Sequence, residues 1–345
     1  MKDLTILSTA CGSMFMPGFF TCLKKNGERN IRIVGVDVVD DPMMGNFIDA
    51  YYKVPRINDI NYVSELIKIC IKESVDVFFP QISMELPIIL SNIEEFKKIN
   101  VKVAITDNDT LLIANNKYRL YEYMKKVNLV VPQYKLIDSV DNFESILNSL
   151  GYPQRPVCVK ITESSGSRGV RIVRPFLSKK DYFMNQKPMS FDISFDEMLE
   201  ILKEFDELPE IIAMEYLPGC EYTIDLLTDH GKTLYICGRR NVESTMSIAM
   251  KSITEKKERA YKLCEDIVRE LKLDGNIGFD FMLDENDNPV LTDLNPRITA
   301  TIILYLNAGL NFPYLRIKQL LGEELPDIDV KYGVKLKRRY LDMFE

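Results

Sequence analysis

The residues best suited to chemistry lie in two short expected strands in the last fifth of the chain. Asp280 lies in the first strand, Asp293 and Asn295 lie in the second, and Arg297 follows closely. The turn-forming segment 284–288 between them predicts a hairpin that pairs Asp280 with Asp293. Side chains two residues apart share a face of a strand, so three oxygen donors converge, and such a set suits Mg²⁺. The alternative is a solvated polar face on an edge hairpin.

A second candidate begins with Lys160, at the end of an apolar strand expected at 157–161. The following loop is rich in small residues, which let backbone N–H groups approach phosphate oxygens, and its glycines can adopt positive φ. Lys160 adds a point charge for the same phosphates. The lysine precedes the glycines, so this is not the P-loop pattern, and an ordinary hairpin turn explains the composition equally well. The loop residues that we assign to phosphate contacts are Ser164, Ser165, Gly166, Ser167 and Gly169.

A third candidate is the segment 214–221, in which two glutamates flank a tight Pro-Gly turn between strands. Backbone groups of Glu215, Tyr216 and Leu217 could clasp an adenine, and Glu221 could reach ribose hydroxyls. A simple connector with two surface glutamates is the alternative interpretation, and for this motif alone it is the favoured one.

The elements that must position these residues differ between the two ends of the chain. In the first third, strands alternate with helices, which predicts βαβ units and a parallel sheet with ligands at the carboxyl ends of its strands. The strands are expected at 4–8, 31–37, 75–80 and 101–105, with an amphipathic helix over 62–72. The last third predicts antiparallel strands at 211–215, 221–227, 233–239, 277–283 and 289–295.

Two polar stretches carry weaker expectations. The segment 179–195 predicts an irregular insertion. The basic residues near the end of the chain predict a solvated strand or tail, and they are Lys335, Lys337, Arg338 and Arg339.

Composition excludes several classes of protein. The 345 residues carry a formal net charge of -7, which weighs against a general nucleic-acid binder. The one histidine, His230, lies in an expected turn, so a Ser-His-Asp or Cys-His nucleophile system or a multi-histidine zinc site is not expected. No apolar stretch reaches the ~20 residues of a membrane span. Seven scattered cysteines without a C-x-x-C pair indicate reduced thiols and a cytoplasmic protein.

The three motifs, in this order, resemble the ATP-grasp superfamily, and the resemblance covers essentially the whole chain. In its carbamoyl-phosphate-synthase-like and D-alanine–D-alanine-ligase-like members, a Rossmann-like pre-ATP-grasp domain precedes two α+β lobes that hold ATP between them. The resemblance therefore implies an α/β and α+β protein with a Rossmann-like pre-ATP-grasp domain at 1–112 and a two-lobed ATP-grasp domain at 113–345. The small ATP-binding lobe would span about 119–213 and the C-terminal lobe about 214–345.

The resemblance also implies a site residue by residue. Mg²⁺, with Mn²⁺ as the alternative ion, would bind Asp280, Asp293 and Asn295, while Arg297 and Lys160 would assist phosphoryl transfer. ATP would be held by Lys117, Lys160, the mobile loop 164–169, the adenine hinge at Glu215, Tyr216 and Leu217, and the ribose ligand Glu221.

Two departures from the family pattern bear on activity. Asp293 stands where the family commonly has glutamate, and this affects whether one carboxylate bridges two ions. Gly278 stands where D-alanine–D-alanine ligases place an arginine, which disfavours that activity. Carbamoyl phosphate synthases are much longer than this chain and carry a duplicated half, so complete carbamoyl phosphate synthesis is not expected.

The resemblance implies that the γ-phosphoryl group of ATP passes to a substrate carboxylate and that an amine then attacks the acylphosphate. This reaction needs no protein nucleophile or histidine base, which agrees with the composition. Arg239 and Arg240 are the candidates for a second substrate carboxylate, with a surface pair that balances acidic neighbours as the equal alternative. Gly12 and Glu85 are the candidates for lining the acceptor pocket.

Three functions remain open from the sequence. The first is a carboxylate–amine ligase that makes an amino-acid or peptide-like metabolite. The second is a carbamoyl-phosphate-synthase-like enzyme that forms an acylphosphate without an amide, and the third is a nucleotide-binding protein without turnover. The complete metal and arginine set argues against the third. The expected partners are small carboxylates and amines, and since ATP-grasp ligases are often dimers, a homodimer is allowed by analogy.

Overall fold

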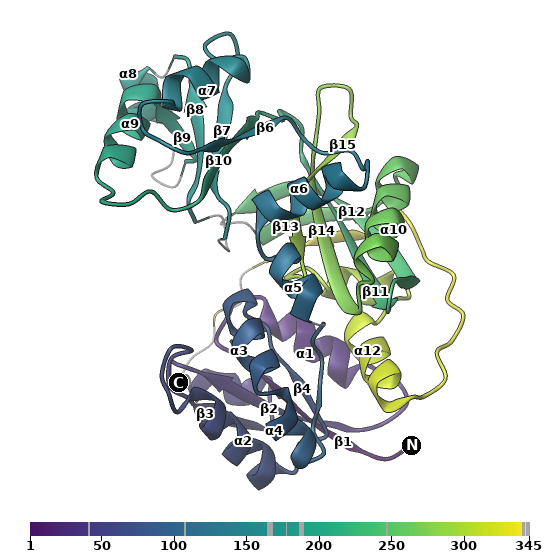
Figure 1. The fold of residues 1–345 in the computed structure, drawn as a ribbon. Coiled ribbons are helices and arrows are strands. Elements are labelled where there is room, and N and C mark those ends of the chain that lie inside the picture. The colour runs from purple at the N-terminus through teal and green to yellow at the C-terminus, as the bar shows by residue number, and fades with distance from the viewer. Residues whose placement is uncertain are drawn as a thin grey trace.

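The computed structural model describes residues 1–40, 42–106, 108–163, 168–176, 178–185, 190–245, 248–339 and 342. Three β-sheets divide these residues into three parts (Figure 1). The N-terminal sheet lies at one end of the molecule, the second sheet at the other end, and the third sheet between them. None of the helices in these ranges is long and apolar enough to cross a membrane.

The N-terminal sheet is parallel and has the strand order β3-β2-β1-β4-β5, as the strand–helix alternation predicts. The order reverses beside β1, so the loops after β1 and β4 meet at the point where open α/β sheets bind ligands. Its strands are β1 (Leu4–Ser8), β2 (Ile31–Asp37), β3 (Ala50–Lys53), β4 (Val77–Phe79) and β5 (Lys102–Val103). Its helices are α1 (Met16–Lys24), α2 (Tyr62–Glu73), α3 (Leu86–Ser91) and α4 (Ile93–Lys98), with 3₁₀ turns η1 (Pro42–Asn46) and η2 (Ser83–Glu85).

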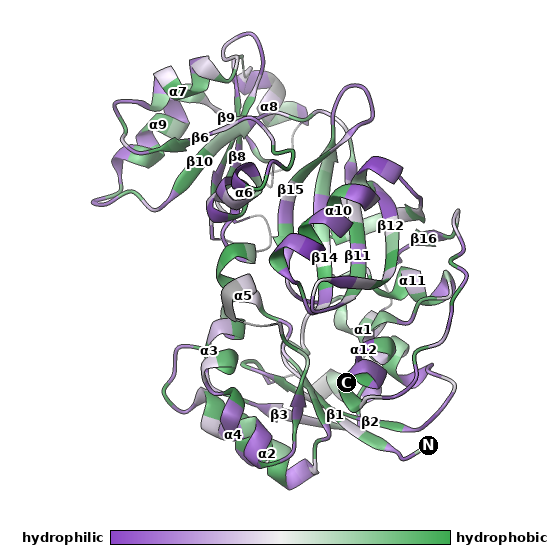
Figure 2. Ribbon diagram, turned by 45° about the vertical axis from the view of Figure 1, so that its right-hand side comes forward, coloured by the Kyte–Doolittle hydropathy of each residue, from purple (hydrophilic) through white to green (hydrophobic). Residues whose placement is uncertain are grey.

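Helix α2 illustrates why the sequence forms these elements. Its apolar residues recur at helical spacing, and Tyr62, Leu66, Ile69 and Cys70 are buried against the sheet. Figure 2 shows both hydrophilic and hydrophobic residues along this helix. The helix ends at Ser74, which adopts a left-handed φ of 53°. These bounds confirm the helix predicted over 62–72.

The second sheet has the order β6-β10-β7-β8-β9. The segment 179–195, predicted to be irregular, instead contains a helix and an edge strand that pairs in parallel with β8. The polar residues there have a structural use, because the Ser194 side chain caps the next helix by accepting from the backbone of Glu197. The elements are β6 (Tyr134–Ile137), α7 (Phe143–Ser149), β7 (Val157–Ile161), β8 (Val170–Arg174), α8 (Lys179–Asn185), β9 (Asp192–Ser194), α9 (Phe195–Lys203) and β10 (Ile211–Glu215).

The third sheet has the order β15-β14-β11-β12-β13-β16 and is antiparallel throughout. Its strands are β11 (Glu221–Asp229), β12 (Lys232–Thr245), β13 (Ile248–Thr254), β14 (Gly275–Leu283), β15 (Pro289–Asn295) and β16 (Lys335–Lys337). The remaining helices are α5 (Asn108–Ala114), α6 (Lys117–Lys126), α10 (Glu258–Leu271), α11 (Ile303–Asn307) and α12 (Phe312–Leu321).

The two faces of the third sheet are covered differently. One face packs Tyr222, Ile224 and Leu226 of β11 into a core with α6 and α10. On the other face, Leu227 packs into a second core shared with α1, α11 and α12. On the same face as Leu227, the earlier side chains of β11 are polar, namely Glu221, Thr223 and Asp225, so a polar surface lies beside the apolar core. One parallel α/β sheet followed by two further sheets confirms the predicted fold class, a Rossmann-like domain followed by two lobes.

Candidate active site

Neighbouring strands of the third sheet bring the predicted metal ligands onto one face. Thr223 of β11 lies opposite Arg239 of β12 on one side and Asp280 of β14 on the other. Asp280 in turn lies opposite Asp293 of β15, which confirms the pairing predicted from the hairpin. A register shift follows directly after Asp280. The predicted pair forms, but it depends on this shift, because nearer the turn Phe281 pairs with Leu291 and Leu283 with Pro289, one residue away from the register predicted from 284–288.

Two side chains hold the carboxylate of Asp280 in place. Thr223 Oγ1 donates to its Oδ1 at 2.9 Å, and Asn295 Nδ2 donates to its Oδ2 at 2.9 Å. Burial raises the pKa of Asp280, and the negative charges of Glu221 and Asp293 raise it further. A divalent cation offsets this crowding of like charge, and two carboxylates with an amide oxygen are ligands that Mg²⁺ and Mn²⁺ accept. The donor set therefore fits the metal that the sequence implies.

Arg239 lies on the same face and is almost fully buried. It forms an ion pair with the buried carboxylate of Asp225, and its Nη1 donates to Tyr305 Oη at 2.6 Å. Its Nε donates to Asn241 Oδ1 at 3.2 Å, and Asn241 Nδ2 donates to Glu221 at 2.9 Å. Arg239 is thus connected through Asn241 to the predicted ribose ligand.

Arg297 lies where the third sheet meets the N-terminal domain. Its Nε donates to Ser83 Oγ at 3.1 Å, its Nη1 to the carbonyl of Ile298 at 2.8 Å, and its Nη2 to Asn295 Oδ1 at 3.4 Å. Burial lowers the pKa of Arg297, although nearby carboxylates partly offset this effect. Over the described ranges Arg297 forms no ion pair, so its positive charge has only neutral partners at contact distance.

Arg338 is a candidate site residue that the sequence analysis did not assign to the site. It directly follows β16, and its Nε and Nη2 donate to the carbonyls of Ala249 and Ala300, each at 3.0 Å. Burial and the neighbouring Arg239 both lower its pKa. Arg338 likewise forms no ion pair within the part of the chain that the structure describes.

Residues 335–337 form β16, as the predicted solvated strand requires, and Lys335, Lys337 and Arg339 are exposed. The prediction of solvation was wrong for Arg338, which is half-buried. The sequence signal that could have placed Arg338 is Leu336 between Lys335 and Lys337, because residues two apart share a face of a strand and Arg338 therefore lies on the face of Leu336.

Lys117 comes to the metal ligands from the start of α6. Its Nζ lies 3.3 Å from Asp293 Oδ2. Asn116 caps the helix by accepting from the backbone of Arg119, and its Nδ2 donates to Glu163 at 3.0 Å and to Glu210 at 2.7 Å. The start of α6 is therefore fixed between the second and third sheets, with Lys117 in the site.

The segment 215–221 joins β10 of the second sheet to β11 of the third. Glu215 ends β10 and accepts from the backbone of Gln133 at 2.8 Å, and Glu221 begins β11. The Arg174 guanidinium lies 4.9 Å from the ring centroid of Tyr216. Leu217 is buried in the core that β11 shares with α6 and α10. The predicted adenine hinge and ribose ligand thus lie where the two sheets join.

The predicted phosphate-binding residues lie on the second sheet. Lys160, in β7, pairs across the strands with Val170 and Ile212. Gly169 has a φ of +67°, and an added Cβ there would lie 2.6 Å from Ile161. The predicted contacts at Ser164, Ser165, Gly166 and Ser167 fall outside the described residues.

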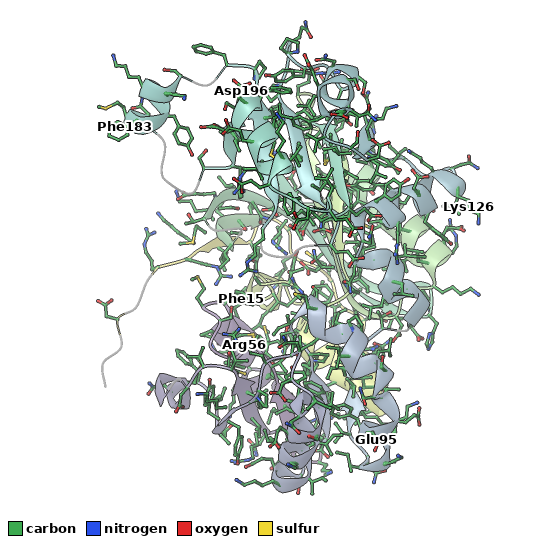
Figure 3. The ribbon with its side chains drawn as sticks, turned by 60° about the vertical axis from the view of Figure 1, so that its left-hand side comes forward. Phe15, Arg56, Glu95, Lys126, Phe183 and Asp196 are labelled. Carbon is green, nitrogen blue, oxygen red and sulfur yellow. The ribbon has the colours of Figure 1, made fainter. Side chains whose placement is uncertain are left out.

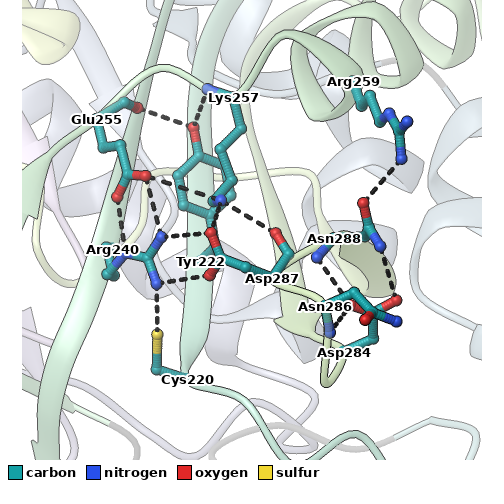
Figure 4. A network of polar contacts seen from close by, with 10 residues as sticks. All are labelled: Cys220, Tyr222, Arg240, Glu255, Lys257, Arg259, Asp284, Asn286, Asp287 and Asn288. Carbon is teal, nitrogen blue, oxygen red and sulfur yellow. Dashed lines mark hydrogen bonds and ion pairs between the residues drawn. The ribbon is translucent and has the colours of Figure 1, made fainter.

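Arg240 lies on the opposite face from Arg239. Its guanidinium donates to Glu255 at 2.7 and 3.0 Å and to Asp287 at 2.9 and 3.0 Å (Figure 4). Lys257 also pairs with Asp287. This network ties the turn of the β14–β15 hairpin to the start of α10. The structure does not bring Arg240 to the metal ligands. Arg240 instead balances acidic neighbours at the surface, which was the alternative interpretation of this residue.

Glu85 and Gly12 lie in the loops after β4 and β1. Glu85 is fully buried and accepts from the hydroxyls of Thr9 and Tyr62 and from the backbone N–H groups of Gln81 and Ile82. Burial raises its pKa. Glu85 therefore anchors the loop rather than lining a pocket. Gly12 is exposed, and its backbone N–H donates to Asp37 at 2.9 Å.

A second group of potential metal ligands lies elsewhere. Side-chain ligand atoms of Asp229, His230 and Asp274 lie within 4.8 Å of one another. Asp274 is already paired with Arg316 at 2.8 Å, and the other two residues are exposed. We assign no role to this group.

Comparison with known proteins identifies the class to which this fold and site belong. Residues 207–339 match the family model described as "ATP-grasp in the biosynthetic pathway with Ter operon". Residues 6–104 match the model described as "PylC-like, N-terminal domain". Residues 207–339 are therefore assigned to the ATP-grasp family and residues 6–104 to a PylC-like N-terminal domain, which confirms the resemblance inferred from the motifs.

Individual relatives are more distant. The chain is 24% identical over 321 residues to the carbamoyl phosphate synthase large chain of Pyrococcus furiosus, with 88% of this chain and 29% of that protein covered. The chain thus spans less than a third of that relative's length.

Solved structures share the fold. The biotin carboxylase domain of Hydrogenobacter thermophilus 2-oxoglutarate carboxylase, a dimer in complex with MgADP, ADP and bicarbonate, has a TM-score of 0.67 at 15% identity, covering 96% of this chain and 73% of that chain. The L-amino acid ligase from Bacillus licheniformis has a TM-score of 0.62 at 17% identity, covering 93% of this chain and 74% of that chain.

Proposed function

We propose that this protein is an ATP- and Mg²⁺-dependent ligase that activates a carboxylate as an acylphosphate for attack by an amine. One observation supports this most strongly. On a single face, the predicted metal ligands Asp280, Asp293 and Asn295 lie next to the guanidinium group of Arg297, which donates to Asn295 and has no acidic partner at contact distance in the described chain. Such an arginine beside a metal site suits an anionic substrate.

In this proposal ATP lies between the second and third sheets. Its adenine would contact the segment 215–217 and its ribose Glu221. Its phosphates would contact Lys160, Lys117 and the small residues of the loop 164–169. Mg²⁺ would be held by Asp280, Asp293 and Asn295, where it would neutralise phosphate charge. Lys117 is suited to leave Asp293 for a phosphate, because their separation of 3.3 Å is that of a loose ion pair.

The carboxylate substrate would lie against Arg297, with Arg239 and Arg338 nearby. A carboxylate oxygen attacks the γ-phosphorus and the bond to the ADP oxygen breaks, which leaves an acylphosphate. The amine nitrogen then attacks the acyl carbon, phosphate leaves, and a proton is lost from nitrogen. Arg297 would stabilise the charge that spreads over the transferring phosphoryl group.

The relatives support the same class of chemistry. One binds MgADP and bicarbonate, itself a small carboxylate, and another is an L-amino acid ligase. The seven cysteines are all free thiols, which supports a reducing compartment, and we place the reaction in the cytoplasm. A dimer of the related biotin carboxylase domain supports a homodimer as the working assembly.

The test measures ADP release and acylphosphate together. The protein is incubated with Mg²⁺-ATP, a panel of carboxylic acids and hydroxylamine, which converts acylphosphates to hydroxamates. We expect acid-dependent ADP release, hydroxamate in equal amount, and loss of both in Asp293→Ala and Asn295→Ala. Glu285→Gln, an exposed turn residue of the same hairpin, is the matched control and should keep activity.

Replacing hydroxylamine with amines then separates the proposed ligase from an enzyme that stops at the acylphosphate. An amide in the mass spectrum supports the ligase. Hydroxamate without any amide, across the full set of amines, would support the carbamoyl-phosphate-synthase-like alternative. Tight ATP binding with no acid-dependent ADP release would support a nucleotide-binding protein without turnover.

A further inference from the structure

Large apolar side chains are exposed where the strands of the N-terminal domain end. Met14 follows β1, Val39 follows β2, and Ile82 and Met84 follow β4, with exposed fractions of 64%, 61%, 36% and 68%. We call these four residues the apolar rim. Because β2, β1 and β4 are neighbouring parallel strands, their carboxyl ends lie at one edge of the sheet.

Two contacts place the apolar rim beside the arginines of the site. Arg297 donates to Ser83, the residue between Ile82 and Met84. Beyond the loop that carries Met14, α1 packs against α11, where a Cβ added at Gly18 would lie 3.2 Å from Ile303. Helix α11 also carries Tyr305, which accepts a hydrogen bond from Arg239. The apolar rim is therefore connected to Arg297 through Ser83, and to Arg239 through the packing of α1 against α11.

Phe15 marks the same edge in Figure 3, where it lies at the side of the N-terminal domain that faces the third sheet. It is half-buried and packs against the core shared by the N-terminal domain and the helices α11 and α12. The loop that exposes Met14 is thus held at the junction of the two parts.

The charge of these loops contrasts with that of the third sheet. In the loops after β1 and β4, residues 9–15 and 80–85, the one charged residue is Glu85, which is fully buried, whereas the end of β2 carries the half-buried Asp37 and the exposed Asp40. A ligand that spans the junction therefore meets cationic groups at one end and, on the loops after β1 and β4, apolar side chains without an exposed charge at the other. Exposed apolar side chains beside convergent polar groups are typical of a ligand site, and methionine adapts readily to the shape of a ligand.

We propose that the apolar rim binds the apolar body of the carboxylic acid whose carboxylate contacts Arg297. The inference rests on the proposed ligase function and narrows its substrate. The acid is one with an uncharged hydrocarbon or thioether body, rather than a dicarboxylate or a cationic acid.

The first experiment compares acids of the same shape and different polarity. 4-Methylpentanoate and succinamate are isosteric, as are L-leucine and L-asparagine, so each pair differs in polarity at nearly constant size. Hydroxamate formation with Mg²⁺-ATP gives kcat/KM for each acid. For at least one pair, we expect kcat/KM of the apolar acid to exceed that of its polar isostere by about tenfold or more. This is the range that a difference of one or two apolar groups produces in a binding pocket.

The second experiment changes the rim itself. Met84→Glu should raise KM for the preferred acid by about tenfold with a smaller change in kcat, because a charge replaces an apolar contact remote from the reacting atoms. Ile71→Glu is the matched control: Ile71 is 60% exposed on the last turn of α2, at the opposite edge of the sheet, and its variant should behave as the wild type. Met84→Lys should shift preference toward an acid with a second carboxylate.

The outcomes separate this inference from the function on which it rests. Hydroxamate formation that favours polar acids, or an unchanged KM in both Met84 variants, overturns the substrate inference and leaves the ligase proposal standing. A Met84→Glu variant that dissociates a dimer while KM stays constant shows instead that a second copy of the chain covers the rim. No hydroxamate with any acid, despite ATP binding, overturns the ligase proposal and with it this inference.

Discussion

Arg239 and Arg240 are adjacent on β12, yet they serve different regions of the molecule. Arg239 lies on the polar face of the third sheet, almost fully buried, with Asp225, Tyr305 and Asn241 around it. Arg240 lies on the other face, pairs with Glu255 and Asp287, and is partly exposed. Strand geometry alone causes this separation, since successive side chains point to opposite faces.

The two faces differ in how completely their charges are paired. On the site face, Arg297 and Arg338 lack acidic partners at contact distance among the described residues, which suits an anionic ligand. Asp280 is held among other negative charges, which suits a cation. On the other face, each charge of the Arg240 network has an opposite charge beside it. A surface built for a ligand keeps charges unpaired, whereas a surface built for stability pairs them.

The largest expected effect separates the faces by activity. Arg297→Met should lower kcat for hydroxamate formation by about 10²–10³-fold, the loss typical of one electrostatic donor at a reacting centre. Arg240→Met should keep wild-type kcat, because Arg240 lies on the opposite face. Steady-state kinetics with saturating ATP measures both. Equal losses in the two variants would contradict the assignment of the faces.

The next effect concerns stability. Arg239→Met should lower the free energy of unfolding by about 3–5 kcal/mol, because it leaves the Asp225 carboxylate buried without its partner. Urea denaturation measures this change. Adding Asp225→Asn to the same variant should recover a large part of the loss, since the uncompensated charge is then gone. A double variant as unstable as Arg239→Met alone would show that packing, not charge, carries the effect.

Local sequence patterns predict much of the site face. The turn residues predict the hairpin and its pair of Asp280 with Asp293, although they do not predict the register shift after Asp280, and the first strand has its predicted bounds, 4–8. The period of two along β12 also separates Arg239 from Arg240. Residue type alone suggests either a substrate carboxylate or surface ion pairs for both arginines, and the alternative of surface ion pairs holds for Arg240 because of its strand face.

Other features depend on distant segments and leave no local signal. Ser83 and Arg297 are 214 residues apart, and their contact exists because the N-terminal domain packs against the third sheet. The position of Glu85 after a parallel strand suggests a pocket residue, yet the loop folds back on its carboxylate and buries it. Domain packing and loop closure of this kind are set by tertiary contacts rather than by local propensity.

A smaller effect sharpens the role of the other face. Arg240→Met should lower the free energy of unfolding by about 1 kcal/mol, since partly exposed ion pairs contribute little even when several share one guanidinium. The loss should be smaller in high salt, which screens exposed pairs. Urea denaturation at low and high salt measures it. A loss as large as that of Arg239→Met would show that the Arg240 network is effectively buried.

The smallest expected effect is a dependence on pH. Hydrogen bonds from Arg240, and then from Lys257, hold the pKa of Asp287 below its ordinary value. A lowered pKa in the folded state stabilises the protein fully above the unfolded pKa of about 3.9, and this contribution is lost as the pH falls toward the folded pKa. Asp287→Asn should therefore cost up to about 1 kcal/mol near neutral pH, and its difference from the wild type should shrink below about pH 4. Glu285→Gln, in the same turn, is the control and should match the wild type at both pH values. A difference that stays constant from neutral to acid pH would mean that Asp287 acts through turn geometry and that charge pairing does not distinguish this face from the site.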